Sequence, residues 1–147
     1  MLRIYRLMKR DDESGGPLTG FGRDRLSVRT PRDIEPDEAG IVQPGKGAMS
    51  VGATLRAVLQ RLPPWAIPER FSYLAPDASG RNNTWIWRMG EGAFLATAVS
   101  QDLLLRLDGL DSDHGCVEPG EPMSIEQYQA ALADTQPQWS IEEPETV

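Results

Sequence analysis

The sequence contains one cysteine, Cys116, and one histidine, His114, in 147 residues. A single cysteine excludes a framework of intramolecular disulfides and is typical of a reducing compartment. One histidine and one cysteine are also too few for the usual structural zinc site, so we expect no metal. No apolar stretch follows the basic N-terminal residues as in a signal peptide, and no run approaches the ~18 apolar residues of a transmembrane helix. We therefore expect a cytoplasmic protein without membrane contact.

Basic residues are scarce in the last third of the chain. Residues 101–147 contain Arg106 against 11 acidic side chains, whereas residues 1–50 carry 9 basic and 8 acidic ones. The formal net charge of −7 and its concentration in one region repel phosphate backbones, which argues against nonspecific nucleic-acid binding. The arginine-rich first half is still compatible with a small anionic ligand.

The pattern of apolar residues predicts short strands and few helices. With 14 glycines and 12 prolines, the chain breaks into short elements, and alternation predicts strands at 2–8, 40–43, 84–89, 93–98, 102–107 and 114–118. Helical spacing after Thr54, and a capping box formed by Ser124 and Gln127, predict two main helices. We expect an α+β domain of small antiparallel sheets over residues 1–135, a long irregular loop at 10–38, and an acidic C-terminal tail at 136–147.

Three separate segments carry residues suited to one kind of chemistry. Arg6 lies on the first predicted strand, Ser50 follows a glycine-rich turn at 45–47, and Glu118 ends the last predicted strand. An arginine fork matches phosphate oxygens bidentately, and a serine hydroxyl orients a sugar or ring. A carboxylate stabilises the positive charge that develops when a glycosidic bond breaks. The three residues together are therefore candidates for binding and cleaving a nucleotide glycoside in a cleft.

Each candidate also has a simpler interpretation. Arg6 is then an outward-facing strand residue, Ser50 caps or enters the following helix, and Glu118 is an ordinary charge at a strand end. His114 is more often a structural histidine than a catalytic base. Three tryptophans are expected in the core and in a cleft wall rather than in a platform that stacks nucleotide bases: Trp65, Trp85 and Trp87.

Three motifs resemble a known family. The run Ile4-Tyr5-Arg6, the turn Gly45-Lys-Gly47-Ala-Met49-Ser50-Val51, and the segment from His114 through Glu118-Pro119 to Pro122-Met123 are similar to the exported-effector-two toxins of bacterial type VI secretion. The resemblance implies an ADP-ribosyltransferase-like fold with NAD as cofactor. It implies that NAD contacts Tyr5, Arg6, Gly47 and Ser50, and that the catalytic set comprises Arg6, Ser50, His114 and Glu118.

The resemblance also sets an expected function. It implies an NAD-dependent antibacterial toxin that arrests growth in the cytoplasm, either by ADP-ribosylating an unidentified macromolecule or by hydrolysing NAD. Its partners would be a cognate immunity protein and the secretion machinery or a carrier, which delivers the toxin by non-classical secretion. The alternative is a noncatalytic interaction protein, an immunity or adaptor protein that docks through its acidic last third. The acidic balance and the single histidine argue against a third activity, RNA phosphotransfer.

Overall fold

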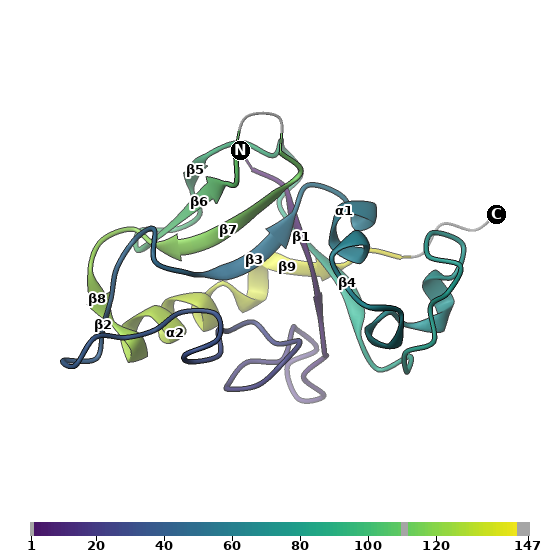
Figure 1. Ribbon diagram of the computed structural model, residues 1–147, viewed down its shortest axis with the longest axis horizontal. Coiled ribbons are helices and arrows are strands. Elements are labelled where there is room, and N and C mark those ends of the chain that lie inside the picture. Colours follow the sequence, from purple (N-terminus) through teal and green to yellow (C-terminus); the bar gives the residue numbers. More distant parts are fainter. Residues whose placement is uncertain (1, 110–111, 144–147) are drawn as a thin grey trace.

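Figure 1 shows the computed structural model, which describes residues 2–109 and 112–143. The strands are β1 (Ile4–Met8), β2 (Ile41–Val42), β3 (Met49–Gly52), β4 (Trp85–Met89), β5 (Thr97–Ala98), β6 (Leu103–Leu107), β7 (His114–Pro119), β8 (Met123–Ser124) and β9 (Trp139–Ile141). The helices are α1 (Leu55–Gln60) and α2 (Ile125–Asp134), with three short 3-10 helices, η1 (Pro64–Ala66), η2 (Glu69–Phe71) and η3 (Gln136–Gln138). The predicted α+β class with two main helices is confirmed.

One large antiparallel sheet replaces the small sheets expected from the sequence. Its order is β5-β6-β7-β3-β1-β4-β9, and only the β2-β8 pair forms a separate sheet among the described residues. The predicted strands at 84–89, 102–107 and 114–118 are found almost at full length, whereas the one at 93–98 is reduced to Thr97–Ala98. Strand β1 therefore lies inside the sheet, between β3 and β4, although it comes first in the chain.

The sheet opens between β1 and β3. These two strands share a single register pair, Tyr5 with Gly52, whereas β1 and β4 are paired along all five residues of β1. In Figure 1, β1 crosses the end of β3 at a steep angle instead of running beside it. Beyond Tyr5 the two strands therefore leave space for side chains between them.

Apolar clusters cover both faces of the sheet. The larger one packs α2 against the sheet and includes Met49, Trp87, Tyr128 and Leu132. The smaller one packs α1 and η2 against the other face of β1 and β4, with Tyr5, Leu7, Leu59, Phe71 and Ile86. Burial of about twenty-five apolar side chains in two layers is the main stabilising contribution to this fold.

The segment 10–38 is irregular, as predicted, but it is not a peripheral loop. Three of its apolar residues, Leu26, Val28 and Ile34, are at most 1% exposed and belong to the larger cluster. Their burial holds the polar residues between them against the sheet. The segment therefore forms one wall of the space between β1 and β3.

The helix ends follow local sequence signals. Ser124 caps α2, and the reciprocal contacts of Ser124 and Gln127 form the predicted capping box. Thr54 caps α1 by accepting a hydrogen bond from the backbone N–H of Ala57. Ser50 lies in β3 and caps no helix, so the simpler interpretation of Ser50 as a helix cap is wrong.

The beginning of the predicted tail is part of the sheet. Residues Trp139–Ile141 form β9 and pair with β4, and Trp139 is 5% exposed in the larger cluster. The sheet therefore extends past the boundary predicted at residue 135, because a large aromatic ring is available to anchor the chain. Residues 144–147 of the predicted tail lie outside the described residues. Among the described residues, no helix has the length and apolarity needed to cross a membrane.

Candidate functional site

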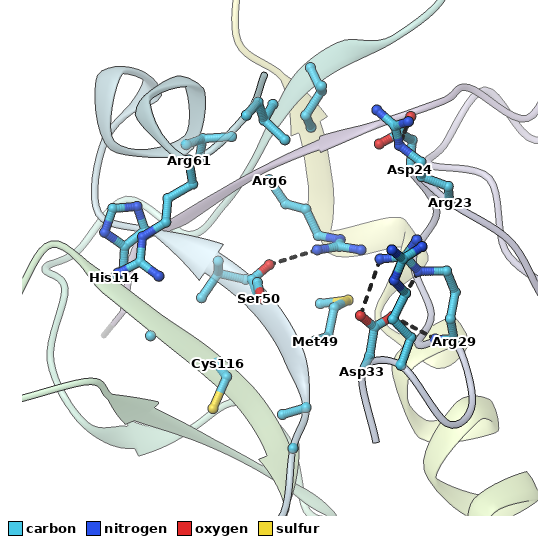
Figure 2. Close-up of a pocket in the computed structure, with 18 of the residues that line it drawn as sticks. Arg6, Arg23, Asp24, Arg29, Asp33, Met49, Ser50, Arg61, His114 and Cys116 are labelled. Atoms are coloured by element: carbon cyan, nitrogen blue, oxygen red, sulfur yellow. Dashed lines mark hydrogen bonds and ion pairs between the residues drawn. The ribbon is translucent and has the colours of Figure 1, made fainter. Parts of the chain in front are cut away.

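A cavity of about 550 Å³ occupies the opening between β1 and β3. Its walls come from β1, from the irregular segment at 22–33, from residues 47–51, from the end of α1 and from the start of β7. Figure 2 shows Arg6 near the middle, with Arg61 and His114 on one side and Arg23, Asp24, Arg29 and Asp33 on the other. The volume lies within the range of about 300–1,000 Å³ that is usual for small-molecule sites.

Arg6 spans the opening. Its Nη1 donates a hydrogen bond to the backbone carbonyl of Ser50 at 2.8 Å, and its Nε and Nη2 donate to the carbonyl of Arg25 at 3.2 and 3.1 Å. These contacts use three of the five N–H groups of a guanidinium. They fix its position and leave one N–H on each terminal nitrogen for a ligand.

The charge of Arg6 is poorly compensated by the protein. Burial lowers the pKa of Arg6, while the more distant carboxylates of Asp33 and Asp24 raise it less. Within the described residues, no carboxylate forms an ion pair with this guanidinium, because its hydrogen bonds go to uncharged carbonyls. A partly desolvated cation of this kind gains from binding an anion.

Positive charge predominates around the cavity. Five arginines and three aspartates line it, which leaves two positive charges in excess. Three of the arginines are paired with an aspartate: Arg23 with Asp24 at 3.5 Å, Arg29 with Asp33 at 3.2 Å, and Arg61 with Asp108 at 3.6 Å. Arg6 and the exposed Arg32 supply the excess, so the cavity is suited to a ligand with about two negative charges.

The glycine-rich turn is shaped by contact with the opposite wall. Gly47 has φ +113°, and a Cβ at this position would lie 2.3 Å from the carbonyl oxygen of Asp33. A larger residue would therefore push the turn away from the segment at 22–33. Gly47 and Ser50 both line the cavity, and Ser50 is exposed on β3. The structure thus brings these two predicted residues together with Arg6.

His114 also lines the cavity, but its ring is held on both sides. Its Nε2 lies 2.6 Å from the carbonyl oxygen of Ala57, and its Nδ1 lies 2.8 Å from the carboxylate of Asp113. The side chain is 13% exposed. The contacts with Ala57 and Asp113 fix the orientation of the ring, and the contact with Ala57 ties β7 to α1. This geometry favours the structural interpretation of His114.

Glu118 is not among the residues that line the cavity. Its side chain is 7% exposed, and Oε2 accepts hydrogen bonds from the backbone N–H of Gly45 at 2.8 Å and from Nε of Arg106 at 2.9 Å. Alternation places Glu118 on the same face of β7 as His114 and Cys116. It lies farther along the strand, where the turn at 44–47 covers it.

Tyr5 is separated from the cavity as well. It is 7% exposed and packs in the smaller apolar cluster with Leu7 and Phe71. Successive residues of a strand point to opposite faces of the sheet, so Tyr5 points away from the face on which Arg6 lies. The structure therefore assembles Arg6, Gly47, Ser50 and His114 from the predicted set and leaves Tyr5 and Glu118 outside.

The arginines of the irregular segment are site residues that the sequence pattern does not reveal. Arg23, Arg29 and Arg32 line the cavity, and Arg25 supplies the carbonyl that holds Arg6. The available signal was the density of arginines in a glycine- and proline-rich segment, which carries no periodicity and therefore no indication of direction. Asp24, with φ +59°, is a non-glycine residue in a rarely used backbone conformation and also lines the cavity.

Two further ionisable groups lie at or behind the wall. Burial raises the pKa of the Cys116 thiol, and Arg106, 3.6 Å from the sulfur, opposes that effect. Burial also raises the pKa of Tyr128, whose hydroxyl accepts a hydrogen bond from the N–H of Met49 and donates one to the carbonyl of Val117. Cys116 is therefore held as a thiol, and Tyr128 joins α2 to β3 and β7.

No protein-family model, curated protein or solved structure matches this chain. Within residues 2–109 and 112–143, no group of three or more His, Cys, Asp or Glu side chains is placed to hold a metal ion. The interpretation of the site therefore depends on its own geometry and charge.

Proposed function

We propose that the cavity binds NAD and that the protein is an ADP-ribosyltransferase-like toxin. It would transfer ADP-ribose to a target macromolecule or hydrolyse NAD in the cytoplasm of the target cell. The observation that carries the proposal is Arg6, a cation held by three hydrogen bonds to carbonyls, in a cavity with two excess positive charges. The pyrophosphate of NAD carries two negative charges, which is the complement of that excess.

The residues that would hold the pyrophosphate are Arg6 and Arg32. Arg6 presents its two remaining N–H groups from a fixed position, which limits the entropy lost when an anion binds. Arg32 is exposed and forms no ion pair with any described carboxylate, so it is available to a ligand. Ser50 lies beside Arg6 and would contact the sugar or the nicotinamide ring through its hydroxyl.

NAD supplies a ribose bond whose cleavage leaves positive charge on the sugar, and carboxylates lower the barrier by stabilising that charge. Three carboxylates line the cavity. Asp33 is held by Arg29 through three hydrogen bonds, and Asp108 is paired with Arg61. Asp24 interacts with its neighbour Arg23 at 3.5 Å. In this arrangement Glu118 acts as a positioning residue, because it holds the turn that contains Gly47.

The test is saturable binding of NAD to the purified protein, measured by calorimetry. We expect binding by the wild-type chain and at least about tenfold weaker binding by Arg6→Ala, since hydrogen bonds to charged groups are worth about 1.5–3 kcal/mol each. Arg56→Ala is the matched control, because Arg56 is exposed on α1 and does not line the cavity. It changes the net charge equally and should leave the affinity unchanged.

Two outcomes contradict the proposal. If the wild-type protein does not bind NAD, the alternative from the sequence, a noncatalytic interaction protein, is favoured instead. If Arg6→Ala and Arg56→Ala bind NAD equally well, the ligand does not occupy this cavity. If NAD binds as expected, release of nicotinamide in the presence and absence of a bacterial lysate separates transfer to a macromolecule from hydrolysis.

A further inference from the structure

Trp65 is a large apolar side chain that the fold leaves in solvent. It is 63% exposed, whereas Trp87 and Trp139 are 1% and 5% exposed, and it belongs to the short helix η1 between α1 and η2. The sequence predicts that Trp65 lies in the core or in a cleft wall, together with Trp85 and Trp87. The prediction is confirmed for Trp87 and is wrong for Trp65, which belongs to neither apolar cluster and is not among the residues that line the cavity. An exposed indole presents an aromatic face on which a flat ligand can stack.

Trp65 is connected to the cavity through Arg23. The guanidinium carbon of Arg23 lies 4.5 Å from the centroid of the Trp65 ring, which is a cation–π contact. Arg23 also lines the cavity and interacts with Asp24. Two segments that are forty residues apart in the sequence therefore meet at the border of the cavity. Phe21, 68% exposed, lies two residues before Arg23.

The contact fixes the ring without covering it. One face of the indole carries the guanidinium, and an exposure of 63% leaves much of the remaining ring surface accessible. A ring that is already oriented loses little conformational freedom when a flat ligand stacks on it. Because Arg23 contacts the ring and also lines the cavity, the accessible ring surface lies at the border of the cavity.

We propose that Trp65, oriented by Arg23, stacks the adenine base of the dinucleotide. This inference rests on the proposed function, in which Arg6 and Arg32 hold the pyrophosphate. Stacking on an aromatic side chain discriminates little between bases. The position of Trp65, rather than the chemistry of the base, therefore decides which end of the dinucleotide stacks on it. The bond that reacts is assigned to the part of the cavity near Ser50 and His114; His114 lies on the opposite side of Arg6 from Arg23 (Figure 2). The end that does not react is therefore assigned to the exposed ring.

The experiment compares four ligands and four proteins. NAD, ADP-ribose and AMP contain adenine, whereas nicotinamide mononucleotide does not; each is titrated into wild type, Trp65→Ala, Trp65→Phe and Leu104→Ala. We expect Trp65→Ala to bind the three adenine ligands about tenfold more weakly and nicotinamide mononucleotide as wild type does. Trp65→Phe keeps an aromatic face and should retain most of the affinity. Leu104, 40% exposed on β6, is the control for removing an exposed apolar side chain.

The failures of the two proposals are distinguishable. If wild type binds NAD, and Trp65→Ala binds both NAD and AMP as tightly as wild type does, the stacking assignment is overturned and the cavity assignment stands. Equal losses for AMP and nicotinamide mononucleotide also overturn it, because the ring then does not select the adenine end. If wild type binds neither NAD nor AMP, both proposals fall. Melting temperatures of the variants, expected to match wild type because Trp65 is exposed, exclude misfolding as the cause of a loss.

Discussion

The carboxylate of Glu118 accepts a hydrogen bond from the backbone N–H of Gly45, with 2.8 Å between Oε2 and the nitrogen. The two residues are 73 positions apart, and the same oxygen also accepts from Nε of Arg106. A buried carboxylate thus connects the end of β7 to the turn that forms one wall of the cavity. Its buried position behind the turn distinguishes Glu118 from the three aspartates that line the cavity.

Glu118→Gln tests whether this carboxylate acts through the turn or on the substrate. We expect a loss of stability of about 1–3 kcal/mol, because a buried partner of Arg106 and Gly45 is weakened. NAD turnover should fall by less than about tenfold, whereas removing a group that stabilises the reacting sugar costs about 10²–10³. Turnover and melting temperature measured together separate the two roles. A rate loss of a hundredfold or more with unchanged stability would restore Glu118 to the catalytic set.

Asp24→Asn is the companion variant. Asp24 lines the cavity and makes only a 3.5 Å contact with its neighbour Arg23, so neutralising it should cost little stability. Because Asp24 lies beside Arg23, at the end assigned to adenine, turnover should stay within about tenfold of wild type; a larger fall at unchanged NAD affinity would instead assign to Asp24 the role of stabilising the developing charge. Wild-type turnover by Asp24→Asn would remove Asp24 from that role.

Arg6→Ala should lower both stability and NAD affinity. The side chain donates to the carbonyls of Ser50 and Arg25, so its removal separates β1 from two walls of the cavity. We expect a loss of about 1–3 kcal/mol in the free energy of unfolding, measured by chemical denaturation. Arg6→Lys keeps the charge but not the planar fork and should recover only part of the loss. Arg32→Ala, at an exposed position, should reduce affinity without changing stability beyond about 0.5 kcal/mol.

Growth arrest is the expected consequence in cells. Expression of the intact chain in a bacterial cytoplasm should stop growth without lysis, and Arg6→Ala should abolish the arrest at equal protein level. Arg56→Ala should arrest growth as wild type does. Normal growth of several hosts with abundant soluble wild-type protein would count against a toxin.

Alkaline pH should destabilise the fold through Tyr128. Burial raises the pKa of this phenol, so its contribution to stability is fully present below about pH 10, the ordinary tyrosine value, and decreases as the pH rises beyond it. Tyr128→Phe leaves the Met49 N–H and the Val117 carbonyl without their partner and should cost about 1–3 kcal/mol at neutral pH. Its stability should then fall less steeply than that of wild type above pH 10. Parallel pH profiles would show that Tyr128 does not control the alkaline limit.

Cys116 should react slowly with alkylating reagents. Burial raises the pKa of its thiol, so the reactive thiolate is scarcer at neutral pH than in the unfolded chain. The alkylation rate, followed by mass spectrometry, should keep rising with pH beyond the ordinary thiol pKa of about 8.5. Because Cys116 lines the cavity, NAD should slow the reaction further. Equal rates for native and urea-unfolded protein would contradict this expectation.

The sequence predicts most elements because their signals are local. The capping box at Ser124, the alternation in β7 and the helical spacing after Thr54 each concern fewer than ten neighbouring residues. The same alternation that places Arg6 in the opening directs Tyr5 to the opposite face, so the position of Tyr5 was predictable from the strand itself. The burial of Leu26, Val28 and Ile34 was not, since an irregular segment has no period that shows which side chains point inward.

The candidate site was predictable only where it follows the strands. Arg6, Ser50 and His114 lie on or at the ends of β-strands, and they meet because the strands are neighbours in the sheet. The covering of Glu118 by Gly45 and the contact of Arg23 with Trp65 join segments forty or more residues apart. Contacts of this range depend on how the whole chain packs, and no local pattern in the sequence encodes them.

The position of β1 inside the sheet has a consequence for biosynthesis. Strand β1 leaves the ribosome before its partners and cannot pair until residues 49–52 and 85–89 have followed, and the cavity is not enclosed until residues 114–116 have joined β3. Such long-range pairings favour slow folding after most of the chain has been made. Nascent chains therefore lack the binding site, and any ligand of the cavity selects the finished fold and protects it against unfolding.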